Sequence, residues 1–122
     1  MLGVMLQDDL TEIITQLRTI GAESSSVEAK SGVGRAVLET LSAFSNQGGG
    51  VLIAGISESD GFTAVADFDP KAARDSLTSF CEQLTPPVRP EIAVLPFESG
   101  QVLVAEIQEM EPRDKPCYVS DR

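Results

Sequence analysis

Two glutamates with the residue type and spacing of metal ligands, Glu23 and Glu28, flank a serine-rich break near the start of the chain. A short strand over 27–30 would place the side chains of Glu28 and Lys30 on one face, with Glu23 just before it. Carboxylates that converge on one site suit Mg²⁺ or Mn²⁺, because these cations prefer hard oxygen ligands. The alternative interpretation is that both glutamates are solvated surface acids in an acidic protein.

A second acidic segment, 57–61, directly follows an apolar run. Loops at the carboxyl ends of strands commonly carry binding residues. Glu58 or Asp60 from this segment would complete an acidic cluster with Glu23 and Glu28. The alternative is a solvated turn built on the Asp-Gly pair.

A run of three glycines, Gly48, Gly49 and Gly50, separates a predicted helix from a predicted strand. The order helix, glycines, strand is the reverse of a phosphate-binding loop, in which glycines lead from a strand into a helix N-terminus. The C-terminal end of a helix also carries the negative end of its dipole, which repels phosphate. The run therefore predicts a tight structural turn, with Asn46 as a left-handed or capping residue and Gly48 as the left-handed residue that ends the helix.

Hydrophobic periodicity predicts the elements that position these residues. Apolar residues at helical spacing indicate one helix over 8–20 and a second that ends near 47. Asp69 and Pro70 begin a third, whose apolar stripe runs from Ala73 to Leu84 and which Pro86 and Pro87 stop. Strands are expected at 27–30, 51–56 and 62–65, and a hairpin pairs 91–97 with 101–107. A polar tail, 109–122, follows the hairpin. Within this tail, 117–119 are the candidate for a final strand. The resulting class is α/β (mixed α+β): a mixed β-sheet with helices packed on it, in the order α-β-α-β-β-α-β-β.

The length of 122 residues and the hydrophobic content of 42% suit one domain, 1–122, with a single core. Nine lysines and arginines against nineteen aspartates and glutamates give a net charge of −10, which counts against tight nucleic-acid binding by this domain alone but leaves room for a local basic strip. The chain has no histidine, which excludes Ser-His-Asp and Cys-His catalysis and a zinc site of mixed Cys and His ligands. Cys81 is expected to be buried on the apolar face of the third helix.

The chain shows no signal peptide and no apolar run approaching the ~20 residues of a membrane span, so we expect a cytoplasmic protein.

Three segments in this order resemble the Schlafen AlbA family. They are 23–30, which ends Val-Glu-Ala-Lys; 41–50, which reads Leu-Ser-Ala-Phe-Ser-Asn-Gln-Gly-Gly-Gly; and the apolar strand that begins at Val51. Pro-Pro-Val-Arg-Pro at 86–90 and Lys-Pro-Cys-Tyr at 115–118 also fit the pattern, so that the resemblance spans roughly 10–119.

The resemblance implies an α/β domain linked to DNA or RNA binding. It also implies a metal-dependent ribonuclease site in some relatives, whose carboxylates match Glu23 and Glu28 here. The third acid of that site is left to Glu58 or Asp60, because Ser57 stands where an Asp is usual. Bacterial relatives continue into an ATPase-like domain and a winged helix, so we expect this chain to be an excerpt of such a protein or a shortened stand-alone version.

The sequence therefore leads to three hypotheses about the function of the chain. The first is a nucleic-acid-binding regulatory module, the N-terminal domain of a transcriptional regulator. The second is a Mg²⁺- or Mn²⁺-dependent endoribonuclease that uses Glu23, Glu28 and either Glu58 or Asp60. The third is a non-enzymatic protein-interaction or homo-oligomerisation domain. The candidate nucleic-acid contacts of the first hypothesis are Lys30, Arg35, Arg74, Arg89, Arg113 and Lys115.

Overall fold

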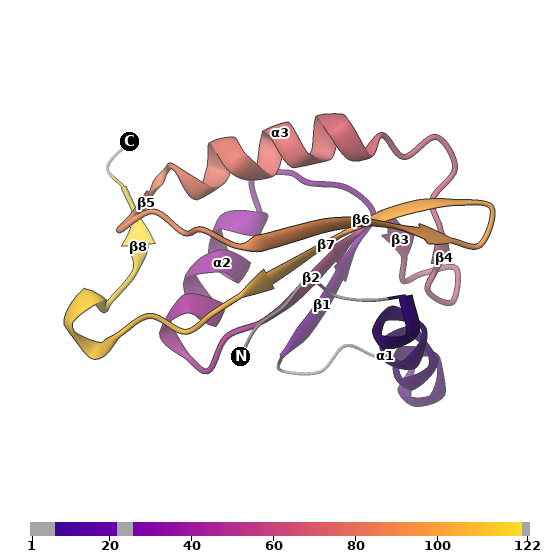
Figure 1. The fold of residues 1–122 in the computed structure, drawn as a ribbon, viewed down its shortest axis with the longest axis horizontal. Coiled ribbons are helices and arrows are strands. Elements are labelled where there is room, and N and C mark those ends of the chain that lie inside the picture. The colour runs from indigo at the N-terminus through magenta and orange to yellow at the C-terminus, as the bar shows by residue number, and fades with distance from the viewer. Residues whose placement is uncertain (1–6, 22–25, 121–122) are drawn as a thin grey trace.

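A four-stranded sheet forms the centre of the molecule, with one helix on one face and two helices on the other (Figure 1). The computed structural model describes residues 7–21 and 26–120. The helices are α1 (Gln7–Ile20), α2 (Val37–Asn46), α3 (Pro70–Cys81) and the short 3₁₀ helix η1 (Pro112–Asp114). The strands are β1 (Val27–Lys30), β2 (Gly50–Ala54), β3 (Ile56–Ser57), β4 (Thr63–Ala64), β5 (Leu84–Thr85), β6 (Glu91–Phe97), β7 (Gly100–Ile107) and β8 (Tyr118–Val119).

The sheet has the strand order β1-β2-β7-β6. Strands β1 and β2 are parallel and are joined through α2, whereas β2 pairs with β7 and β7 with β6 in antiparallel fashion. This mixed sheet and its packed helices confirm the fold class predicted from the sequence.

Strand β2 is apolar throughout because both of its faces are covered. Leu52 and Ala54 pack under α2 and α3, and Ile53 packs under α1. The predicted strand over 51–56 is interrupted at Gly55, which has a φ of +102° and leaves no room for a Cβ beside the ring of Phe68. The chain therefore turns out of the main sheet, and β3 pairs with β4 as a separate small hairpin.

Helix α3 begins as predicted. The Asp69 carboxylate accepts hydrogen bonds from the amides of Lys71 and Ala72, both at 3.1 Å, and Pro70 is the first helical residue. Cys81, which ends the helix, is buried as expected, and burial raises the pKa of its thiol to about 11. The prediction that the helix extends to Leu84 is wrong, since Leu84 lies in β5.

Strand β8 confirms the expected final strand at 117–119. It pairs with β5, so that Leu84 lies opposite Val119 and Thr85 opposite Tyr118. Figure 1 shows this β5–β8 ribbon at the end of the molecule away from α1. Among the described residues, no helix is both long and apolar enough to cross a membrane.

Candidate functional site

The glycine run forms a tight turn in which two residues take the left-handed conformation. Gly48 has a φ of +85° and Gly49 a φ of +76°, and the Gly49 amide donates to the Phe44 carbonyl at 2.8 Å. A Cβ on Gly49 would lie 2.6 Å from the carbonyl oxygen of Ile107, and one on Gly50 would lie 2.6 Å from the Phe44 ring. The turn is thus a close crossing of backbones.

Asn46 is not the left-handed or capping residue that the sequence predicts. It is the last residue of α2, and its side chain reaches the segment that leads into β8. Its Oδ1 accepts from the Cys117 amide at 2.8 Å, and its Nδ2 donates to the Cys117 carbonyl at 3.0 Å. Ser42 donates to the same carbonyl at 2.8 Å. Asn46 therefore fastens the C-terminal segment to α2.

Glu28 faces α2, and its carboxylate is held by two partners, Thr40 of α2 and Lys30 of β1. The Thr40 hydroxyl donates to it at 2.8 Å, and the Lys30 ammonium lies 2.9 Å away. Burial by itself would raise the pKa of Glu28, but the hydrogen bonds from Lys30 and Thr40 outweigh it and lower the pKa below its usual value. Glu28 is thus an ionised, half-buried carboxylate at neutral pH. The expectation that Glu28 and Lys30 share a face is confirmed.

The acidic segment 57–61 forms the turn between β3 and β4. Within it, the Ser57 hydroxyl donates to the Asp60 carboxylate at 3.0 Å, while the side chain of Glu58 is exposed. The strands that flank this turn are anchored on the α1 side of the sheet, because Ile56 and Phe62 belong to the core cluster that α1 covers.

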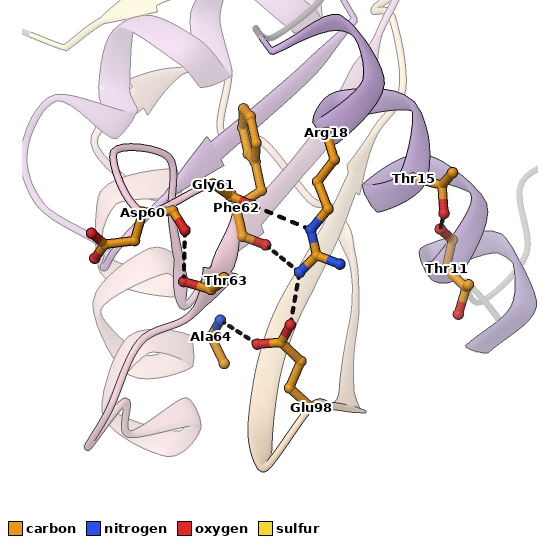
Figure 2. A network of polar contacts seen from close by, with 9 residues as sticks. All are labelled: Thr11, Thr15, Arg18, Asp60, Gly61, Phe62, Thr63, Ala64 and Glu98. Carbon is orange, nitrogen blue, oxygen red and sulfur yellow. Dashed lines mark hydrogen bonds and ion pairs between the residues drawn. The ribbon is translucent and has the colours of Figure 1, made fainter.

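Arg18 of α1 fixes the end of this turn in place (Figure 2). Its guanidinium donates to the carbonyls of Gly61 and Phe62 at 3.2 and 2.9 Å and pairs with Glu98 at 2.7 Å. Glu98 in turn accepts from the Ala64 amide at 2.9 Å. Those bonds from Ala64 and Arg18 lower the pKa of Glu98.

The structure does not bring the predicted metal ligands together among the residues that it describes. Glu28 faces α2, whereas the turn that carries Glu58 and Asp60 is anchored on the opposite side of the sheet. No group of three or more acidic or cysteine side chains in the described ranges is placed to hold a metal ion. Glu23, the remaining predicted ligand, lies outside the described residues.

Most of the six basic candidates are engaged by other groups. Lys30 pairs with Glu28, Arg89 with Glu82 at 3.4 Å, and Lys115 with Glu109. Arg74 donates to the Ile92 carbonyl at 3.4 Å. The two others, which are Arg35 and Arg113, are exposed, and neither side chain has an ion pair or hydrogen bond to any other described residue.

Four of the six lie near the β5–β8 ribbon. Arg35 and Val119 line one surface depression of about 400 Å³. Arg89 lines another, of about 350 Å³, together with Asp114 of η1. Arg113 and Lys115 belong to the segment that runs through η1 into β8. This end of the molecule thus carries basic side chains from separate parts of the sequence, and acidic ones lie among them, namely Glu39, Glu109, Glu111 and Asp114.

Comparison with known protein families assigns the chain to one of them. The family model described as Schlafen, AlbA_2 matches residues 23–121, so the chain belongs to the Schlafen AlbA family. The resemblance inferred from the sequence motifs is thereby confirmed.

Two solved structures share the fold. One is the solution structure of the N-terminal domain of a protein from Nitrosomonas europaea, named as related to the ATP-dependent DNA helicase RecG. It has 29% sequence identity and a TM-score of 0.76, over 91% of this chain and 80% of that one. The other is the crystal structure of the DIP2311 protein from Corynebacterium diphtheriae, at 15% identity and a TM-score of 0.57; the match covers 93% of this chain but 24% of that one, and it shows the fold alone. The comparison with curated proteins gives no match.

Proposed function

We propose that the chain is a nucleic-acid-binding regulatory module, the N-terminal part of a transcriptional regulator. The observation that carries this proposal is the likeness, over nine tenths of the chain, to the N-terminal domain of a protein named for a DNA helicase. Membership of the Schlafen AlbA family supports it. The basic side chains around the β5–β8 ribbon supply the candidate contacts.

The charges of the molecule limit how strongly it binds. A net charge of −10 repels a polyanion, and of the six candidates Arg35 and Arg113 are the two with no partner among the described residues. Each neutralised phosphate contributes about −0.9 for duplex DNA, or about −0.7 for a single strand, to the slope of log affinity against log salt. Two contacts therefore predict weak binding with a shallow slope, of about −1.4 to −1.8.

Replacing Arg35 or Arg113 by alanine is expected to make this slope shallower by about 0.7 to 0.9 for each arginine. The measurement is fluorescence anisotropy of a labelled oligonucleotide between about 50 and 200 mM salt. Lys71→Ala is the matched control, because it removes the same charge from α3, where Lys71 pairs with Asp75 at 3.4 Å. Arginine variants with the slope of the Lys71→Ala variant would show that neither arginine contacts a phosphate.

The pair formed by Glu28 and Lys30 favours a second function, a Mg²⁺- or Mn²⁺-dependent endoribonuclease. Glu28 offers an ionised carboxylate with a lysine 2.9 Å away on the same face. Of the ligands predicted for this site, the described residues supply Glu28 on this face, and Glu23 is the second ligand that the sequence predicts. A bound metal ion would supply an activated water for attack on phosphate, while Lys30 and Thr40 hold the Glu28 carboxylate in place.

If the chain is this nuclease, Glu28→Gln is expected to reduce Mn²⁺-dependent RNA cleavage at least about 100-fold, because the neutral amide is a poor ligand for a hard cation. Glu12→Gln serves as the control, since Glu12 is an exposed residue of α1. Cleavage is followed on a labelled RNA with and without chelator. Activity that persists in the Glu28→Gln variant would exclude this assignment.

A further inference from the structure

Tyr118 is an exposed aromatic side chain on the β5–β8 ribbon. It is the single tyrosine of a chain that has no tryptophan, and 54% of its surface is exposed. Its neighbours in sequence point the other way: Cys117 is buried, and Val119 packs against the core cluster that α2 and α3 cover. Because successive side chains of a strand point to opposite faces, the Tyr118 ring faces solvent.

The two arginines with no described partner lie in segments next to β8, the strand that carries Tyr118. Val119, which follows Tyr118, lines the same depression as Arg35, on the face of the ribbon opposite the Tyr118 ring. Arg113 lies in η1, in the segment that leads directly into β8. Glu39 also lines that depression, so the surface is mixed in charge rather than strongly basic.

This arrangement has the elements that proteins use to bind single strands, namely an exposed aromatic ring and cationic side chains in the segments on either side of it. A base stacks on a ring without any net charge, so the acidic surface of this chain does not cancel that contribution. A single strand also has a lower charge density than a duplex and is repelled less by a net charge of −10. Both considerations favour a single-stranded ligand.

We propose that Tyr118 is a stacking platform for a base of single-stranded nucleic acid, with Arg35 and Arg113 on the flanking phosphates. This inference rests on the proposed function and names its ligand class. It also assigns a role to the tyrosine of the Lys-Pro-Cys-Tyr segment at 115–118, which phosphate contacts by basic side chains do not include.

The intrinsic emission of the protein tests the proposal directly, because all tyrosine emission comes from Tyr118. Adding unlabelled oligothymidylate at about 50 mM salt is expected to quench most of this emission at saturation, after correction for absorption by the oligonucleotide. A matched duplex is expected to quench it less at the same nucleotide concentration. Binding seen by anisotropy without any change in emission would overturn the stacking role.

Variants separate stacking from other effects of the side chain. Tyr118→Leu is expected to bind the single strand about 5- to 150-fold more weakly, and Tyr118→Phe within about twofold of the wild type, because stacking needs the ring and not the hydroxyl. Ile20→Ala is the control, since Ile20 is, among the residues that the structure describes, the other large apolar side chain that is exposed, at 70%, and it lies on α1 at the far end of the molecule (Figure 1). A circular dichroism melt of each variant checks that it is folded.

The outcomes distinguish this inference from the function on which it rests. Wild-type affinity in the Tyr118→Leu variant, together with unquenched emission in the wild type, overturns the stacking role and leaves nucleic-acid binding in place. A preference for duplex over single strand also overturns it. Failure of the wild-type chain to bind any oligonucleotide overturns the proposed function, and the stacking role with it.

Discussion

Replacing Gly49 by alanine is expected to lower the free energy of unfolding by about 2–5 kcal/mol. The residue has a φ of +76°, which costs an alanine about 1–2 kcal/mol. The new Cβ would lie 2.6 Å from the Ile107 carbonyl oxygen and 3.2 Å from the Glu109 nitrogen. Both are backbone atoms of the segment that crosses the turn, so neither can rotate aside, and the overlap costs about 1–3 kcal/mol more.

The measurement is urea unfolding followed by circular dichroism, with Gly48→Ala as the control. Gly48 has nearly the same φ, +85°, but no atom lies within 4 Å of a Cβ built there. Gly48→Ala is therefore expected to lose only about 1–2 kcal/mol. Equal losses for the two variants would show that the backbone crossing beside Gly49 imposes no constraint.

Replacing Asn46 by alanine is expected to cost about 2–3 kcal/mol, because it removes both hydrogen bonds to the Cys117 backbone and leaves the Cys117 amide without its acceptor. The effect is also expected to be local. The amides of β8 should exchange with solvent faster than in the wild type, while those of β2 and β7 change less. Hydrogen exchange with urea unfolding measures both effects.

Ser42→Ala is the matched control for Asn46→Ala. Ser42 gives one hydrogen bond to the Cys117 carbonyl, and that carbonyl keeps the bond from Asn46 when Ser42 is lost. We expect the Ser42 variant to lose about 1 kcal/mol. An Asn46→Ala variant no less stable than Ser42→Ala would contradict the view that Asn46 fastens the C-terminal segment.

The sequence predicts those parts of the fold that local chemistry determines. Asp69 and Pro70 begin α3 because an Asp side chain caps the first amides and a Pro fits the first turn. The glycine turn and the hairpin of β6 and β7 follow from similarly local signals. The helix that ends before Leu84 could not be predicted from its apolar stripe, because pairing with Val119, far along the chain, places Leu84 in a strand.

The partners of the site residues depend on tertiary contacts that no local pattern shows. Asn46 and Cys117 are 71 residues apart, and Arg18 reaches Glu98 across 80. The sequence identifies Asn46 through its motif but assigns it the wrong role for this reason. The alternation of β1 does place Glu28 and Lys30 on one face, yet Thr40 becomes a partner of Glu28 only because α2 packs over that face.

The most direct test of the central claim is a titration of the wild-type chain into labelled single-stranded and duplex oligonucleotides, read by anisotropy at about 50 and 200 mM salt. We expect measurable binding at the lower salt, tighter for the single strand, that weakens by about 7- to 12-fold at the higher salt. No binding to either oligonucleotide at the lower salt would contradict the claim that this chain is a nucleic-acid-binding module.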